Sequence, residues 1–166
     1  MRLDALDLKI LGTLQTNGRL SNQELADLVA LSPSACHRRV KLLEEHGYIE
    51  GYNATLSAPK LGFRIEAFVE LNIGQLNESE HQYFTREIQA MDEVVNAFIV
   101  TGQANYLLYV RTRDFEEFSQ FIVNRLNKLR GVTRIHSQIV LDKLKSRGKF
   151  VPIDSLQGGA SAPESR

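Results

Sequence analysis

The chain of 166 residues is short for two ordinary domains, and its apolar fraction of 43% and charged fraction of 24% are typical of a globular protein. Twenty basic residues balance twenty acidic ones, so net charge carries no information about nucleic-acid binding. The single cysteine, Cys36, excludes a disulfide framework and a zinc site built from thiolates. The chain starts with MRLDALDLK, which is no secretory signal, and no apolar run approaches the ~20 residues of a membrane span, so we expect a cytoplasmic protein without membrane contact.

Two helix starts follow each other closely at the beginning of the chain. Asp4 is a plausible N-cap for a helix that runs to about Gly18. Ser21 is the next N-cap, and Glu24 stands three residues later, as a capping box requires. Apolar spacing predicts that this second, short helix buries the following side chains: Leu25, Leu28 and Val29.

A third helix starts at Ser32, with Pro33 in the first helical position, where no N–H is lost. Helical spacing places Cys36, Val40 and Leu43 on one face, which we predict to be buried. The same spacing gives the helix a second face of hydrogen-bond donors: Ser34, His37, Arg38 and Lys41.

Two capped helices joined by a tight turn, the second with donors on its first turns, are typical of a helix-turn-helix that binds DNA. Phosphate affinity needs a local basic face rather than a net charge, although the same face taken alone also fits a merely solvated helix. The segment 48–56 is rich in β-forming residues around a glycine and fits a two-stranded wing. We predict a DNA-binding surface made of these residues: Ser21, Asn22, Ser32, Ser34, His37, Arg38, Arg39 and Lys41.

From residue 63 onward the hydrophobic period changes from helical to alternating. Strands are predicted over 63–73, 94–101, 105–112 and 132–144, with helices over 77–91 and from Asp114 to about Leu129. We expect the second helix of this half to bury Phe118, and the first to bury these residues: Tyr83, Phe84, Ile88 and Met91. The order β-α-β-β-α-β is the ferredoxin-like arrangement, so the whole chain is predicted to be an α+β protein. Both helices would cover one face of the sheet, and the other face calls for a partner, most simply a second copy in a two-fold dimer.

The sequence therefore divides into four parts. We expect a winged helix-turn-helix domain over 1–50, a wing and linker strand over 51–62, a ferredoxin-like oligomerisation domain over 63–146, and a flexible tail over 147–166. Basic residues gather between 125 and 149, where Asp142 is the only acidic residue. Their last members, within 143–149, are a solvated strand end, a second DNA contact or an assembly surface.

Two stretches of the chain resemble the Lrp/AsnC (leucine-responsive/asparagine regulator, or feast/famine) family of transcription factors. They are LDLKILGTLQTNGRLSNQELADLVALSPSACHRRVKLLEEHGYIEGYNATLSAPKLG and VTGQANYLLYV followed by VTRIHSQIVLDKLK. The resemblance implies a winged helix-turn-helix domain and a regulatory domain of the RAM type that senses small molecules, usually amino acids. It also implies dimers that assemble into higher homo-oligomers. The effector site it implies lies around the turn between the second and third strands: Thr101, Gly102, Gln103, Ala104, Asn105, Tyr106 and, on the last strand, Ser137.

One position of that turn departs from the family pattern, since Asn105 stands where the family usually has Asp. An Asp holds an ammonium group by a charge-assisted hydrogen bond, whereas Asn offers a neutral carbonyl and an additional donor. Either the ammonium is held more weakly, or backbone carbonyls hold it, or the ligand is not an ordinary α-amino acid. The alternative is that residues 103–105 form only a hairpin turn that favours Asn.

The sequence thus predicts a sequence-specific regulator that binds double-stranded DNA and responds to an amino acid or related metabolite through its assembly state, without a cofactor or metal. An architectural DNA-binding protein of low specificity, without an effector, is the alternative. An enzyme is not expected, because the chain has no nucleophile with a base at a readable spacing, no phosphate-binding glycine loop and no metal cluster.

Overall fold

The computed structural model describes residues 1–145, which form two compact units, Met1–Thr55 and Leu56–Leu144. The tail predicted over 147–166 lies outside these residues. In the described part of the chain, no helix has the length and apolar character that a membrane span needs.

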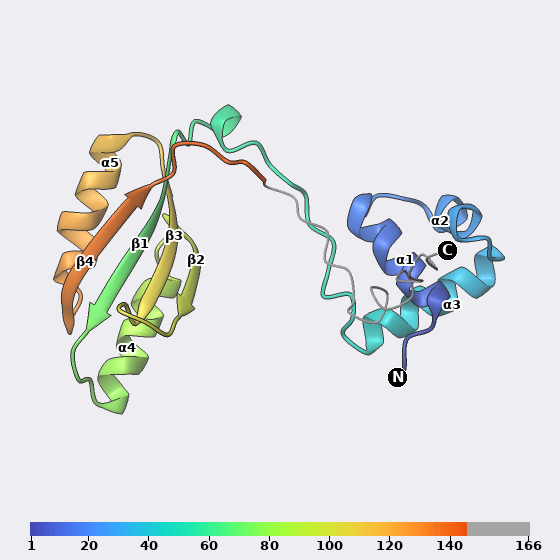
Figure 1. Ribbon diagram of the computed structural model, residues 1–166, viewed down its shortest axis with the longest axis horizontal. Helices are drawn as coiled ribbons and strands as arrows, with labels where there is room; N and C mark the ends of the chain where they lie inside the picture. Colours follow the sequence, from blue (N-terminus) through green and yellow to red (C-terminus); the bar gives the residue numbers. More distant parts are fainter. Residues whose placement is uncertain (146–166) are drawn as a thin grey trace, which may run out of the picture. The chain divides into compact units, whose positions relative to one another are not determined.

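The first unit contains three helices, α1 (Ala5–Thr16), α2 (Asn22–Val29) and α3 (Pro33–Glu45) (Figure 1). The predicted starts are confirmed, because the side chains of Asp4, Ser21 and Ser32 each accept a hydrogen bond from the backbone N–H three residues later. Each cap satisfies a donor that the first helical turn leaves open. The three helices enclose a small apolar core of fully or nearly fully buried residues: Ile10, Leu25, Ala26, Val29, Cys36 and Leu43.

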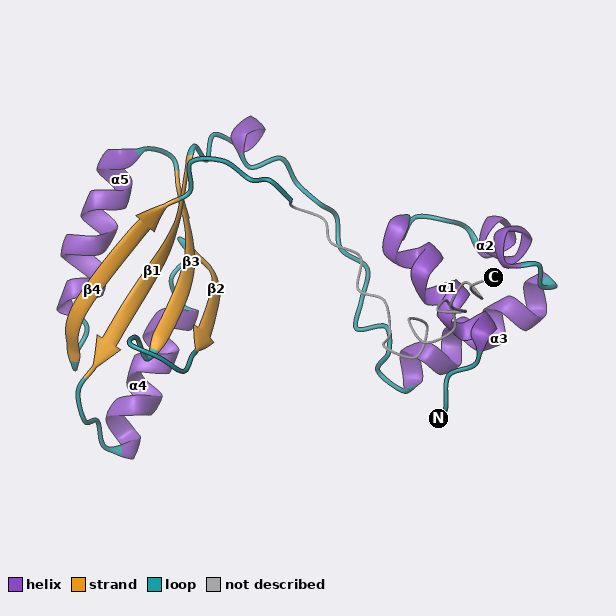
Figure 2. Cartoon of the chain, viewed as in Figure 1, coloured by secondary structure: helices purple, strands orange, loops and turns teal. Residues whose placement is uncertain are grey.

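Two expectations for this unit are wrong. Leu28 is 55% exposed, because α2 turns only a narrow stripe, which includes Leu25 and Val29, toward the core. The wing over 48–56 is also absent: residues 49–57 form an extended loop, drawn in teal in Figure 2, without a strand. A β-ladder needs a second strand, and the described residues provide none for this segment.

The second unit has the predicted ferredoxin-like order. Strands β1 (Ile65–Ile73), β2 (Val94–Ile99), β3 (Tyr106–Thr112) and β4 (Val132–Ile139) form an antiparallel sheet in the order β2-β3-β1-β4. Helix α4 (Glu78–Gln89) connects β1 to β2, and α5 (Phe115–Gln120) follows β3. Figure 1 shows both helices against one face of the sheet, and the alternate residues Ala67, Val69 and Leu71 of β1 point into the core between the two layers.

Details of this unit differ from the prediction. Tyr83 is 47% exposed, while Phe84, Ile88, Met91 and Phe118 are buried as expected. The helix after β3 is not regular: a π-helical turn (Phe121–Arg125) and a 3₁₀ turn (Leu126–Lys128) follow α5, and together they keep both Phe121 and Leu126 in the core. The last strand ends at Ile139 rather than near residue 144.

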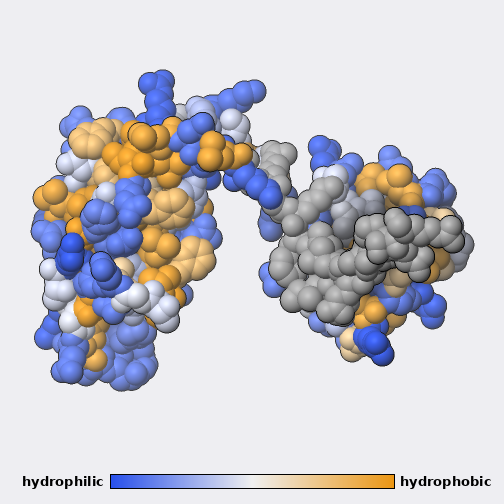
Figure 3. Space-filling model, in the orientation of Figure 1, coloured by the Kyte–Doolittle hydropathy of each residue, from blue (hydrophilic) through white to orange (hydrophobic). Residues whose placement is uncertain are grey.

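The face of the sheet opposite the helices, which we call the open face, alternates with the buried one along every strand. Apolar and aromatic side chains lie on this face beside charged ones, and Phe68 and Phe98 are 40% and 50% exposed. Figure 3 likewise shows hydrophobic side chains next to hydrophilic ones at the visible surface of this unit. An exposed apolar patch of this kind is typical of a surface that meets another molecule.

Candidate functional site

Helix α3 presents a polar face to solvent. All four residues of the predicted donor face are exposed: Ser34, His37, Arg38 and Lys41. The helix is anchored from its opposite side by Cys36 and Leu43, which are completely buried, and burial raises the pKa of the Cys36 thiol. Lys41 Nζ lies 3.7 Å from Oε1 of Glu45, one helical turn further on. Both side chains are exposed, so breaking this ion pair costs little free energy. The face can therefore donate hydrogen bonds to a ligand without repacking the core.

Arg39 differs from its neighbours on α3. Its Nη1 lies 2.7 Å from Oδ1 of Asp7 and 2.8 Å from Oδ2 of Asp4, and the Asp7 side chain is only 2% exposed. Hydrogen bonds to Asp7, and then to Asp4, raise the pKa of Arg39. The Asp7 N–H and then the Arg39 guanidinium lower the pKa of Asp4. The structure therefore ties Arg39 to the start of α1, a role that sequence reasoning missed.

Asn22 also serves the geometry of the helix pair. Its Nδ2 donates a 2.8 Å hydrogen bond to the carbonyl oxygen of Pro33, which joins the first turn of α2 to the first turn of α3. The hydroxyls of Ser21 and Ser32 are occupied as helix caps, although both residues are exposed. Of the eight predicted DNA-binding residues, four thus form the open donor face, and the other four act in caps, a helix–helix hydrogen bond or an ion pair.

In the second unit, the turn between β2 and β3 is held against the end of β1. Asn105 makes the contact: its N–H donates to the carbonyl of Leu71 at 3.0 Å, and its Oδ1 accepts the N–H of Ile73 at 2.8 Å. Gly102 has φ of +122°, a conformation that side chains rarely adopt. The Asn105 side-chain oxygen therefore supports the backbone at the end of β1, while its Nδ2 and the second lone pair of Oδ1 can still meet a ligand.

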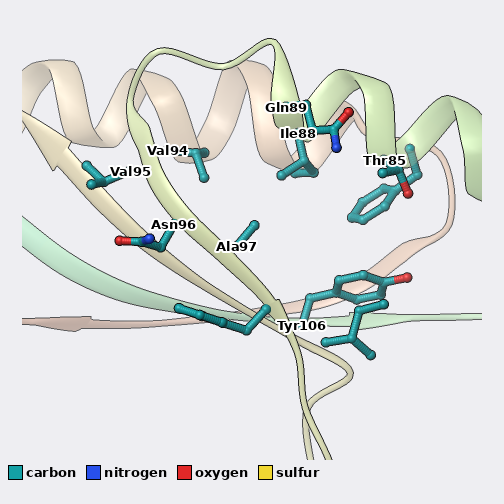
Figure 4. A pocket seen from close by; sticks show the side chains of 11 residues that line it. Thr85, Ile88, Gln89, Val94, Val95, Asn96, Ala97 and Tyr106 are labelled. Carbon is teal, nitrogen blue, oxygen red and sulfur yellow. The ribbon is translucent and has the colours of Figure 1, made fainter. Parts of the chain in front are cut away.

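Tyr106 connects the turn to helix α4. Its hydroxyl lies 2.8 Å from Nε2 of His81, its ring packs against Phe84 at a centroid distance of 5.0 Å, and burial raises its pKa. Next to it, a groove of about 490 Å³ runs between α4 and β2. Figure 4 shows Thr85 and Ile88 of α4 on one side of this groove, with Ala97 and Tyr106 on the other. An apolar side chain fits such a lining.

The other predicted effector residues are not all brought together. Thr101, Gly102 and Gln103 are exposed on the turn, and Ala104 is buried. Ser137 of β4 pairs with Val69 of β1 and shares its helix-covered face. Strand β4 lies on the side of β1 away from β2 and β3, which carry the turn. Within one chain, Ser137 therefore does not join the turn residues.

A second hollow, on the open face, was not predicted from the sequence. It has a volume of about 270 Å³ and is lined by polar side chains of β1, the turn and β4: Glu70, Asn72, Gln103, Arg134, His136 and Gln138. Asn72 Nδ2 donates a hydrogen bond of 2.5 Å to the Gln103 carbonyl, so the hollow reaches the turn. The alternation of β1 places Glu70 and Asn72 on one face, but only the strand pairing shows that residues of β4 face them.

Two family models match the chain. The model described as winged helix-turn-helix DNA-binding matches residues 3–50, and that described as the Lrp/AsnC ligand binding domain matches residues 66–150. Leucine-responsive regulatory proteins are similar over 149 residues: that of Haemophilus influenzae is 36% identical and that of Escherichia coli K12 is 33% identical. The alignments cover 90% of this chain in both cases, and 90% and 91% of those proteins.

Solved structures of transcriptional regulators share the architecture. A regulator from Neisseria meningitidis in complex with L-methionine has a TM-score of 0.88 and 37% identity, with 93% of this chain and 99% of that chain covered. An AsnC-family regulator from Agrobacterium tumefaciens has a TM-score of 0.85 and 27% identity, with the same coverage.

Proposed function

Because the chain belongs to the Lrp/AsnC family of transcriptional regulators, we propose that α3 reads a specific double-stranded DNA site and that the second unit binds a free amino acid. Membership makes the protein an effector-responsive, DNA-binding regulator of transcription rather than an enzyme. We also propose which residues bind DNA and the effector, which effector is bound, how copies of the chain assemble, and that the protein is cytoplasmic.

The DNA assignment rests on the exposed donor face of α3, whose opposite face is anchored in the core by Cys36 and Leu43. Ser34 and His37 lie on the first turns of α3, where a recognition helix contacts base edges. Arg38 and Lys41 extend the same face with positive charge for the phosphate backbone. Arg39 is not part of this surface, because its guanidinium is bound to two carboxylates of the same unit.

The effector proposal rests on the turn, residues 101–106, and the groove beside it. The groove has an apolar lining next to Tyr106, and the regulator from N. meningitidis was solved with L-methionine. Both observations support an amino acid with an apolar side chain. Its side chain would lie in the groove between α4 and β2, with its polar end toward the turn.

We further propose that two copies associate through the open face of the sheet. Phe68, Phe98 and the half-buried Leu107 and Tyr109 lie on this face without a covering layer. A two-fold dimer covers such a patch with its own copy and carries two α3 helices to one DNA site. An effector that changes higher assembly would change how many helices engage DNA at once, and so the apparent affinity.

DNA reading is tested by selecting a binding site from random duplexes and measuring its affinity by fluorescence anisotropy. We expect Arg38→Ala to weaken binding without lowering the melting temperature, and to reduce the slope of log affinity against log salt by about 1. Arg64→Ala, which removes an exposed arginine of the second unit, is the control. Intact affinity in Arg38→Ala would contradict the assigned surface, and equal affinity for all duplexes would favour the architectural alternative.

The effector is tested by thermal unfolding of the full chain with each common amino acid. A ligand that binds only the folded state raises the melting temperature by mass action. We expect a rise with methionine or another apolar amino acid, and no rise with any of them would overturn the proposed ligand class.

A further inference from the structure

We infer that Tyr52 is a positioning residue that sets the spacing of the DNA half-sites which two copies of the chain read together. It does so by binding back to its own unit, which limits the length of the linker that carries each α3 helix. The inference rests on the proposed function, since it takes α3 as the DNA-reading helix and the second unit as the place where two copies associate. It adds a rule for half-site spacing and the residue that imposes it.

The chain that leaves α3 turns back onto the first unit before the linker begins. Gly47 has φ of +72°, a left-handed conformation that ends the helix. The N–H groups of Tyr48 and Ile49 then both donate to the carbonyl oxygen of Leu43, at 2.9 and 3.2 Å. Ile49 packs against the core of the unit. Up to residue 49, the chain is therefore held by α3 and the core beneath it.

Three residues further on, Tyr52 makes a second attachment to the same unit. Its hydroxyl donates a 2.9 Å hydrogen bond to Oε1 of Glu44, on the last turn of α3. Its ring lies against Gly18, which follows α1: a β-carbon at that glycine would be 3.5 Å from Cδ1 of the ring. Burial, and then the Glu44 carboxylate, raise the pKa of Tyr52 to about 12, so the hydroxyl remains a donor at neutral pH. Tyr52 thus joins the start of the linker to the ends of two helices.

The linker beyond Tyr52 has no such attachment until the second unit begins. Within the described part of the chain, residues 53–56 are exposed and make no hydrogen bond. The next attachment is Ser57, whose carbonyl oxygen accepts the N–H of Leu61 at 3.1 Å, and the neighbouring Ala58 is buried. The free linker therefore consists of residues 53–56 alone.

Release of Tyr52 would extend this free segment to residues 50–56. An extended chain spans about 3.3–3.6 Å per residue, so the additional residues 50–52 increase the reach by about 10 Å. This distance corresponds to about three base pairs of B-DNA for each copy. A short linker gives two joined DNA-reading units a narrow optimum in spacing, whereas a longer linker broadens the optimum and lowers the effective concentration of the second unit. The Tyr52 contact therefore favours a narrow range of spacings.

The experiment varies the spacing between two copies of the selected half-site, one base pair at a time, and measures affinity by fluorescence anisotropy. The full chain is compared with Tyr52→Phe, which loses only the hydroxyl, and Tyr52→Ser, which also loses the ring. Tyr83→Phe and Tyr83→Ser are the matched controls, because Tyr83 of α4 has a similar exposure, 47% against 50% for Tyr52. A further variant inserts Gly-Ser-Gly after Asn53 and so lengthens the linker directly.

We expect Tyr52→Ser and the insertion to extend the range of accepted spacings by about three base pairs or more. At the best spacing, both should lose about twofold in affinity, because the effective concentration falls with linker length. Tyr52→Phe should show the same change to a smaller extent, since its ring still covers Gly18, and the Tyr83 controls should keep the narrow range. Affinity for a single half-site should be unchanged in every variant, because the donor face of α3 is unaltered.

An unchanged range of spacings in Tyr52→Ser would overturn the inference, whether or not the insertion broadens that range. A loss of affinity for the single half-site in Tyr52→Ser would also overturn it, because Tyr52 would then act on α3 rather than on the linker. Both results leave the proposed function intact. Equal affinity of the unaltered chain for single and paired half-sites would instead contradict DNA reading by two joined copies, and the inference with it.

Discussion

Arg39 of α3 and Asp7 of α1 lie 2.7 Å apart, and the Asp7 carboxylate is almost completely shielded from solvent. The same guanidinium also reaches Asp4, the N-cap of α1. The ion pair thus joins α3, which we assign to DNA reading, to the first turn of α1. It fixes the direction of α3 from the side opposite its exposed donor face.

The Arg39 pair predicts a loss of stability rather than of a phosphate contact. Arg39→Met leaves a buried Asp7 oxygen without its donor, and we expect the free energy of unfolding to fall by about 2 kcal/mol. Denaturant unfolding measures this change. The salt slope of DNA binding should stay the same, in contrast to Arg38→Ala, because the number of phosphate contacts is unchanged. A reduced slope with intact stability would place Arg39 on DNA instead.

Asn105 predicts a difference between two substitutions in the turn. Asn105→Asp keeps the oxygen that accepts the Ile73 N–H, so the melting temperature at neutral pH should change little. Asn105→Ala removes that acceptor, and we expect it to lower the free energy of unfolding by about 1 kcal/mol. Thermal unfolding of both variants beside the unaltered chain makes the comparison. Equal stability of all three would show that the hydrogen bond contributes nothing to the turn.

Glu66 predicts a component of acid sensitivity. Burial by itself would raise the pKa of Glu66 in the folded chain, but the hydrogen bonds from Lys143 and Tyr109, with the charge of Arg111, together lower it. The stabilisation is therefore complete above its ordinary value of 4.5 and is lost as pH falls through the lower folded value. We expect Glu66→Gln to be less stable than the unaltered chain at pH 7, and the difference to shrink below pH 4.5. A difference that is independent of pH would contradict this account.

Phe68 predicts the strength of self-association. Its side chain is 40% exposed on the open face, where the centroid of its ring lies 5.2 Å from the centroid of the Tyr109 ring. We expect Phe68→Ser to weaken the dimer by about tenfold or more, because apolar area buried between the copies is lost. Sedimentation equilibrium measures the dissociation constant. Val123→Ser, at an apolar residue of the helical layer that is 55% exposed, is the control and should leave association unchanged.

Much of the local structure was predictable from the sequence because its causes are local. The caps Asp4, Ser21, Ser32 and Asn77 bond to the N–H groups three residues later, so each helix start is encoded within a few positions. The alternation of 65–73 likewise sorts each side chain onto one of two faces. With the order of the elements, these signals determined the α+β class, the ferredoxin-like unit and the exposed donor face of α3.

The remaining features were decided by contacts between residues far apart in the chain. The Arg39 pair spans 32 positions, and nothing in the spacing distinguishes Arg39 from Arg38 as a DNA contact. Leu28 and Tyr83 follow apolar patterns yet stay exposed, since burial depends on which neighbours cover a helix face. The strand register alone moves Ser137 away from the turn and brings Glu70 opposite His136. Sequence periodicity assigns a side chain to a face, but only the tertiary structure decides what that face meets, because pairing is set by packing energy summed over the whole unit.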